Sequence, residues 1–223
     1  MLLPDRTVEL ELLAQLAQVS SRPILAGVDE VGRGALAGPA SVGISLIDDA
    51  AGDFPPGLRD SKLLSPARRA GLVEPCKAWT LATVVGHSTV DEINEWGIMG
   101  GLRAAAARAV AQIEALGLSF DGVLLDGSHD WWTSAALVPA GPELPDLPVH
   151  MEVKGDARCA VVAAASVVAK VERDAVMKDL DLRFPGYDWA RNKGYSSPSH
   201  IAALGELGPS AAHRTSWHLP GVN

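Results

Sequence analysis

The chain has 223 residues, of which 48% are hydrophobic, and it carries a net charge of −8 and two cysteines. This length supports one sizeable core, and Cys76 and Cys159 lack the paired spacing of a zinc site or a disulfide framework. No uncharged stretch approaches the roughly 20 residues that span a membrane, and the charged first turns argue against a signal peptide. We therefore expect one domain over residues 1–223 that is monomeric, cytoplasmic and without a membrane partner.

The acidic balance argues mildly against a nucleic-acid partner, because such proteins usually carry a basic surface. The charges are unevenly distributed, however. Residues 1–153 hold 10 Lys and Arg against 20 Asp and Glu, whereas residues 154–223 hold 9 against 7. A basic surface for an anionic substrate would therefore draw mainly on the last third of the chain, and acids bound to metal would inflate the formal negative charge.

Helical and strand-like patterns alternate in the first part of the chain. Apolar residues recur at helical spacing near the N-terminus, and two apolar runs joined by a glycine-rich turn follow. A serine followed by proline is typical of a helix start, because serine caps and proline fits the first turn. In chain order the predicted elements are a helix over 5–19, strands over 24–31 and 40–47, a loop over 48–64, a helix from Ser65 and a strand over 79–88.

The second part continues this alternation. Its predicted elements are a helix over 89–116 interrupted near 97–101, a strand over 122–125, an irregular excursion over 127–147, a strand over 149–153, a helix over 157–182, a loop over 184–198, a short helix from Ser199 and an irregular tail over 208–223. Early antiparallel strands followed by alternating helices and strands predict an α/β fold with a mixed sheet flanked by helices. Its core would cover about residues 23–182, with a C-terminal helical and loop part over about 183–223.

Two adjacent acids, Asp29 and Glu30, close the first apolar run and are followed at once by Gly32, Arg33 and Gly34. Acids at the end of a buried strand are costly unless a positive group accompanies them, and a divalent cation with hard oxygen ligands is the natural partner. Glycines allow a backbone to approach a ligand closely, and an arginine suits a phosphate. These features predict a metal-dependent site that acts on a phosphate backbone.

Two further acids, Asp126 and Asp156, can join this site. Asp126 closes its own strand, and ligand sites in α/β sheets gather at strand ends. Because converging carboxylates repel one another, two Mg²⁺ ions about 4 Å apart would both stabilise the cluster and serve phosphodiester hydrolysis. Adjacent strand residues point to opposite faces, so Asp29 and Glu30 share a pocket only where the strand ends, bulges or twists. For any single acid, the alternative is a surface carboxylate placed there by coincidence.

Further sequence blocks accompany these acids in a specific order. Beyond the run 27–34 with Ala37-Gly38-Pro39, they are Asp60-Ser61-Lys62-Leu63-Leu64-Ser65, Leu125-Asp126-Gly127, Lys154-Gly155-Asp156, the helical segment 163–174, Lys193-Gly194-Tyr195 with His200, and His213-Arg214-Thr215-Ser216-Trp217. These blocks resemble the signature of bacterial ribonuclease HII, the type 2 ribonuclease H family. The resemblance covers about residues 23–217.

The resemblance implies a ribonuclease H-like mixed sheet with a C-terminal helical extension, and the activity of a metal-dependent endoribonuclease. Such enzymes hydrolyse the RNA strand of RNA–DNA hybrids. They also cut 5′ of ribonucleotides embedded in duplex DNA, leaving a 3′-hydroxyl and a 5′-phosphate, which implies a role in ribonucleotide removal from DNA. By resemblance, two Mn²⁺ or Mg²⁺ ions are held by the catalytic acids, which map onto Asp29, Glu30, Asp126 and Asp156.

The resemblance also implies a set of substrate contacts. The Gly-Arg-Gly motif at Gly32, Arg33 and Gly34 would contact the backbone around the RNA–DNA junction, and Tyr195 would sense the junction. A 2′-hydroxyl is what distinguishes RNA from DNA at one position, and a ring stacked on the next deoxyribose would be crowded by such a hydroxyl.

Six other residues in these blocks have two open interpretations. Lys62, Lys154, Lys170 and Arg173 are phosphate contacts or solvated surface charges. His213 and Arg214 contact substrate phosphate or tie the C-terminal tail to the body of the protein.

Three other functions compete with this interpretation. Ribonuclease HIII enzymes usually carry a sizeable N-terminal substrate-binding domain, whereas about 23 residues precede the first predicted strand here. A non-catalytic nucleic-acid-binding protein on the same fold would be expected to lack one of the four acids. A nucleotide-binding enzyme is disfavoured, because the sequence has no G-x-x-x-x-G-K-[ST] loop.

Overall fold

The structure, a computed structural model, describes residues 3–133 and 140–222, so residues 134–139 of the predicted excursion lie outside the described residues. Its centre is a five-stranded sheet in the order β3-β2-β1-β4-β5. The β1–β2 and β2–β3 pairs are antiparallel, whereas β1–β4 and β4–β5 are parallel. The mixed sheet predicted from the sequence is therefore confirmed. The strands are β1 Leu25–Val31, β2 Ser41–Ile47, β3 Ala82–His87, β4 Gly122–Asp126 and β5 Val149–Glu152.

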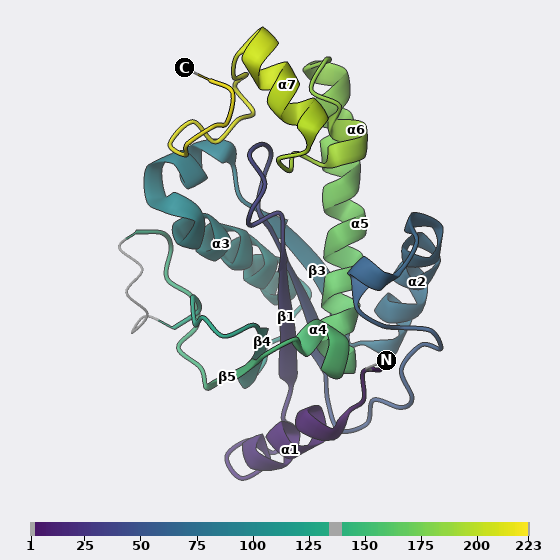
Figure 1. Cartoon of the computed structure of the whole chain (residues 1–223). Coiled ribbons are helices and arrows are strands. Elements are labelled where there is room, and N and C mark those ends of the chain that lie inside the picture. Colours follow the sequence, from purple (N-terminus) through teal and green to yellow (C-terminus); the bar gives the residue numbers. More distant parts are fainter. Residues whose placement is uncertain (1–2, 134–139, 223) are drawn as a thin grey trace.

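Two long helices, α3 Val90–Ala115 and α5 Ala160–Arg183, cover the two faces of this sheet (Figure 1). Alanines of α3 pack with Val28, Val42 and Ile44 in one hydrophobic cluster, while the alanine- and valine-rich start of α5 packs against the other face. Small side chains on both helices let them approach the sheet closely. The first half of α5 is buried all round, as its continuous apolar sequence predicts.

The remaining helices are short and lie around this three-layer core. Helix α2 begins as predicted, because the Ser65 side chain accepts a hydrogen bond from the Arg68 N–H and Pro66 occupies the first turn. Helices α6 and α7 lie with the C-terminal tail at the end of the molecule opposite α1 (Figure 1). The helices are α1 Thr7–Leu16, α2 Pro66–Trp79, α4 Gly155–Arg158, α6 Trp189–Asn192 and α7 Pro198–Leu207.

The structure corrects three predicted boundaries. The helix expected over 157–182 is divided into α4 and α5 at Cys159, whose backbone is extended and forms a bridge with Asp5. Trp79 ends α2 instead of starting a strand, so β3 begins three residues later, at Ala82. The loop expected over 184–198 contains the short helix α6. The predicted interruption of the helix over 89–116 is found at Gly97, which has a φ of 73°.

Across the described residues, no helix is both long and apolar enough to cross a membrane.

Close helix packing makes Gly86 in β3 a sensitive position. A Cβ there would lie 1.9 Å from the Ala105 carbonyl oxygen of α3, so the sheet and the helix would have to separate. We expect Gly86→Ala to lower the free energy of unfolding by about 1–3 kcal/mol, as measured by urea denaturation. The matched control is Gly71→Ala in α2, where nothing lies within 4 Å of the added Cβ. This control should be stabilised by about 0.5–1 kcal/mol, and equal effects of the two substitutions would contradict the packing argument.

Candidate active site

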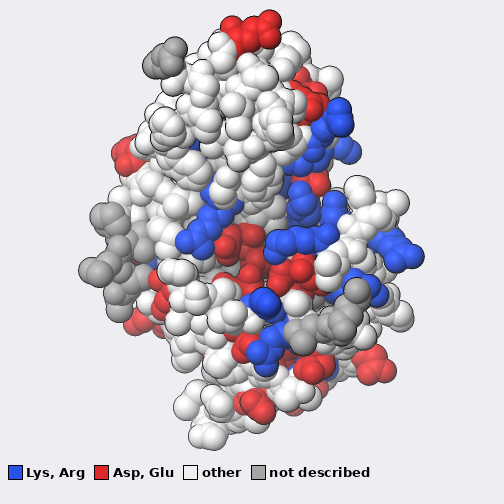
Figure 2. Space-filling model, viewed as in Figure 1, with Lys and Arg blue, Asp and Glu red and all other residues white. Residues whose placement is uncertain are grey.

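Three of the four predicted acids lie on the α5 side of the sheet, at the point where β4 ends. The parallel pairing of β1 with β4 stops at Val28 and Leu125, so Asp29 continues beyond its partner strand next to Asp126. Asp156 is in the first turn of α4, and its N–H lies 3.4 Å from Asp126 Oδ1. Figure 2 shows a red acidic patch in the centre of the drawn face of the molecule, with blue basic side chains on several sides of it.

Glu30 lies on the opposite face of β1, because the strand stays regular as far as Val31. The expected end or bulge at this residue is therefore absent. The Glu30 carboxylate pairs with Arg33, with Oε1 and Nη1 3.5 Å apart. Its other oxygen, Oε2, is buried and has no hydrogen-bond partner within residues 3–133 and 140–222. Beyond the end of β4, Glu30 is still close enough for its charge to raise the pKa of Asp29.

Burial and mutual repulsion raise the pKa values of these acids. Burial raises the pKa of Asp29 well above its usual range, and Asp126, Glu30 and Asp156 raise it further, while the Ser166 hydroxyl lowers it. Burial also raises the pKa of Asp126, with the charge of Asp156 as the next cause. The site therefore requires protons or cations to remain compact near neutral pH.

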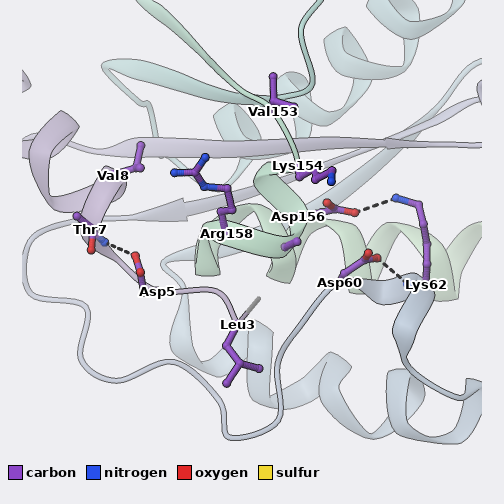
Figure 3. Close-up of a pocket in the computed structure, with 11 residues that line it drawn as sticks. Leu3, Asp5, Thr7, Val8, Asp60, Lys62, Val153, Lys154, Asp156 and Arg158 are labelled. Atoms are coloured by element: carbon purple, nitrogen blue, oxygen red, sulfur yellow. Dashed lines mark hydrogen bonds and ion pairs between the residues drawn. The ribbon is translucent and has the colours of Figure 1, made fainter. Parts of the chain in front are cut away.

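A lysine supplies part of that positive charge. Lys62 Nζ lies 2.8 Å from Asp156 Oδ2, and the stem of Lys62 is mostly exposed (Figure 3). Burial lowers the pKa of Lys62, but the hydrogen bond and the charge of Asp156 outweigh this effect and raise it. Beside this pair, a cavity of about 1110 Å³ is lined by Lys62, Lys154, Asp156 and Arg158 among other residues. Lys154 is exposed in the left-handed conformation that leads into α4.

The donor set fits a hard divalent cation. All four acids offer oxygen ligands, and burial together with neighbouring acids raises the pKa values of Asp29, Glu30 and Asp126. Among the described residues, one buried Glu30 oxygen has no hydrogen-bond partner. In the described part of the chain, no three His, Cys, Asp or Glu side chains are already arranged around one point. Side chains of this site would therefore have to turn toward a shared ion when it binds.

The buried side chain of Arg214 holds the Gly-Arg-Gly turn in place. This guanidinium donates to the carbonyl oxygens of Arg33 at 2.8 Å and Gly32 at 2.7 Å. Gly32 is buried with a φ of 84°, and a Cβ there would collide with Arg173, so this position requires glycine. Gly34 is exposed, and a Cβ there would meet nothing within 4 Å. The open side of the turn is therefore at Gly34, while Gly32 serves packing.

Tyr195 lies on a tight loop that is held by two residues outside the predicted site. Tyr195 is 39% exposed, and the guanidinium carbon of Arg173 lies 5.5 Å from the centre of its ring. Arg173 is fully buried and donates to the carbonyl of Lys193 at 3.0 Å. His200 Nδ1 contacts the Tyr195 carbonyl at 2.9 Å. Sequence reasoning gave Arg173 and His200 no positioning role, because neither spacing nor residue type reveals that a charged side chain is buried.

The other predicted substrate contacts, His213, Arg214 and Lys170, differ in how deeply they are buried. His213 and Arg214 are 1% and 0% exposed, so of their two expected roles the contacts support the one that ties the tail to the body. His213 Nε2 lies 3.0 Å from His200 Nε2, and burial lowers the pKa of His213 to about 4. Lys170 is half-buried and pairs with Asp174 at 2.5 Å.

Comparisons with known proteins show which family this chain resembles. A family profile described as Ribonuclease HII matches residues 26–219. A protein from Streptomyces avermitilis named Ribonuclease HII is 42% identical over 96% of this chain and 83% of its own length. A protein of the same name from Roseobacter denitrificans is 44% identical over 86% of this chain and 89% of its own length.

The chain belongs to the ribonuclease HII family. It is therefore a metal-dependent endoribonuclease that acts on the RNA strand of RNA–DNA hybrids. The ribonuclease H2 structure from Pyrococcus horikoshii OT3 has a TM-score of 0.66 and 27% identity, and the match covers 88% of this chain and 94% of that one. A structure titled Bst-RNase HIII in complex with Mn²⁺ has a TM-score of 0.63 at 16% identity, which shows the shared ribonuclease H-like fold. Membership in the HII family decides against the HIII and non-catalytic alternatives.

Burial of the acids and repulsion among them predict how this ribonuclease HII responds to metal and pH. Because the folded-state pKa values of Asp29 and Asp126 are raised, the native state binds more protons than the unfolded state above pH ~4. Metal-free stability should therefore fall as the pH rises from that value through the raised pKa values. In EDTA at pH about 7.5, we expect Asp126→Asn to raise Tm by about 2–4 °C, as measured by thermal denaturation.

The same measurement with added Mn²⁺ separates metal binding from repulsion. Mn²⁺ should raise the Tm of the natural chain and have less effect on Asp126→Asn, because one ligand is lost. Glu11→Gln removes one exposed acid from α1 and serves as the charge-matched control, with little expected change. A lower Tm for Asp126→Asn in EDTA would show that repulsion does not dominate at this residue.

Proposed function

We propose that this enzyme cuts the strand 5′ of ribonucleotides embedded in duplex DNA, as well as the RNA strand of hybrids. The products would be a 3′-hydroxyl and a 5′-phosphate, and the role would be the removal of ribonucleotides from DNA in the cytoplasm. The observation that carries this proposal is the buried group of carboxylates at the end of β4, where Asp29, Asp126 and Asp156 interact. Such a group is unfavourable without cations and suits phosphodiester chemistry with them.

Asp29, Glu30, Asp126 and Asp156 would hold the ions, which we propose are two Mg²⁺ or Mn²⁺. When bound, such ions supply a water of lowered pKa and neutralise charge on the leaving oxygen. The remaining work belongs to the chain itself. The buried carboxylates would orient the ions, and the Glu30 oxygen that has no hydrogen-bond partner among the described residues supports this role.

Lys62 would hold Asp156 in place before metal binds, since its ammonium lies 2.8 Å from that carboxylate. Its exposed stem allows it to turn to a substrate phosphate once a cation takes over its charge-balancing role. Lys154 is exposed at the same edge and suits a second phosphate contact.

Recognition of the junction would involve the Gly-Arg-Gly turn and Tyr195. The exposed Gly34 leaves space for a sugar-phosphate backbone to approach main-chain amides, and the half-exposed Arg33 can reach a phosphate. Leu36 N–H donates to the Gly194 carbonyl at 2.8 Å, so the turn and the tyrosine loop are joined through backbone. This connection supports the proposal that the turn and Tyr195 together recognise two adjacent sugars, one with a 2′-hydroxyl and one without.

The first test is cleavage of a duplex DNA that carries one ribonucleotide in a labelled strand, with Mn²⁺, Mg²⁺ or EDTA. We expect metal-dependent cutting 5′ of the ribonucleotide, and a loss of at least about 100-fold in rate for Asp126→Asn, because a metal ligand is removed. Product ends are identified by extension from the 3′-hydroxyl. Cutting only of long hybrids would reject the embedded-ribonucleotide part of the proposal, and full activity of Asp126→Asn would reject the site.

A second test concerns Tyr195. We expect Tyr195→Ala to lower the preference for an RNA–DNA junction over continuous RNA by about tenfold, because a stacking ring contributes about 1–3 kcal/mol. Tyr195→Phe keeps the ring and should retain most of the preference. The measurement is the ratio of kcat/KM for the two substrates, and an unchanged ratio in Tyr195→Ala would remove the residue from junction recognition.

A further inference from the structure

A basic pocket lies between α2, α5 and α6, next to the loop that carries Tyr195. Its volume is about 410 Å³. Figure 2 shows that basic side chains gather beside the acidic patch on this face of the molecule. The charged side chains that line the pocket are Arg69, Asp174, Lys178, Arg191 and Lys193, and Lys170 pairs with Asp174 at its edge.

The charges in this pocket are unbalanced. Among the described residues, Asp174 is the one acid that lines the pocket, and it already pairs with Lys170 at 2.5 Å and Arg69 at 3.8 Å. Over the ranges 3–133 and 140–222, neither Lys178 nor Arg191 has a carboxylate within 4.0 Å. In a chain with a net charge of −8, such a concentration of cations points to an anionic ligand.

Repulsion among the cations of the pocket also indicates an anionic ligand. Burial lowers the pKa of Lys193, and although Asp174 opposes this, the Lys178 and Lys170 ammonium groups lower it further. Burial also lowers the pKa of Lys170, and Arg69 is among the cations that lower it further. Ammonium groups that repel one another in a half-buried pocket are stabilised when an anion binds between them.

The position of the pocket along α5 relates it to the acids. Ser166, Lys170, Asp174 and Lys178 follow one another at intervals of four residues and so lie along one side of the helix. Ser166 contacts Asp29, whereas Asp174 and Lys178 are 8 and 12 residues further on. At a rise of 1.5 Å per residue, the pocket is about 12–18 Å from the acids, which is roughly four or five base pairs of duplex.

The pocket is also rigidly linked to Tyr195. Lys193 precedes Tyr195 by two residues, and the Tyr195 N–H donates to the Asn192 carbonyl at 3.0 Å within one tight turn. Arg173 lies over the Tyr195 ring and donates to the Lys193 carbonyl. The loop therefore carries the Tyr195 ring at one end, while Arg191 and Lys193 form a wall of the pocket.

We propose that this pocket binds backbone phosphates of duplex DNA on the 3′ side of the ribonucleotide, roughly four or five base pairs from the cut. The inference rests on the proposed function, in which Tyr195 contacts the deoxynucleotide that follows the ribonucleotide. A duplex that runs from the acids past Tyr195 would next reach the cations of the pocket, which are Lys193, Arg191 and Lys178.

The test uses duplexes with one ribonucleotide, in which the 3′ flank is either about two or about ten base pairs and the 5′ flank is constant. A mirrored pair varies the 5′ flank. Kd is measured in the Asp126→Asn background, so that the substrate stays intact. Lys178→Ala with Arg191→Ala should weaken binding of the long 3′ flank by about tenfold at about 0.1 M salt, and should lower the salt slope by about 2.

The control is Arg22→Ala with Arg183→Ala, which removes two exposed charges outside the pocket. It should leave the flank dependence and most of the salt slope unchanged. Equal losses in the 3′ and 5′ series, or no loss for Lys178→Ala with Arg191→Ala, would overturn the inference. Cutting 5′ of the ribonucleotide by the natural chain is checked first, so failure of the proposed function would appear there, independently of any flank effect.

Discussion

Repulsion among buried carboxylates at the end of β4 is the constraint on which this structure depends. Asp29 is 3% exposed and Asp156 is 4% exposed, and the backbone of neither residue can move far, because one is in a central strand and the other starts a helix. Backbone N–H groups near Asp156 and the ammonium of Lys62 offset part of this repulsion. The rest is left for protons or metal, so the fold stores an unfavourable arrangement that ligand binding relieves.

Buried arginines perform the complementary task of holding irregular backbone in place. Arg173 and Arg214 are both fully buried, and both donate to carbonyl oxygens of loops instead of pairing with carboxylates. Burial lowers the pKa of Arg214 to about 9, so the charge persists at neutral pH while its donors satisfy the Gly-Arg-Gly turn. Because these loops lack regular hydrogen bonding, the two guanidinium groups give them the rigidity that a recognition surface needs.

How far the sequence predicts this arrangement depends on the kind of information each residue carries. The strands and the start of α2 follow from apolar periodicity and the Ser65-Pro66 pair, which are local signals. The convergence of Asp126 with Asp29 required the neighbouring order of β1 and β4, which strand-end patterns only suggest. The burial of Arg214 depends on contacts with residues about 180 positions away, and no local pattern reveals it. Glu30 lies within a regular strand, where an end, bulge or twist was expected, because β1 remains paired with β2 up to Val31.

The net charge of the chain gives a poor account of the field that a substrate meets. Acids concentrate in the centre of the candidate site, and cations lie on its edges (Figure 2). Without metal, the central carboxylates repel a phosphate that the edges attract, so the two effects oppose each other. Once cations neutralise the centre, both regions favour the same polyanion. Metal and nucleic acid must therefore strengthen each other's binding by the same factor, since coupling between two ligands is reciprocal. An acidic protein can in this way bind a nucleic acid, with its affinity dependent on the metal that its chemistry requires.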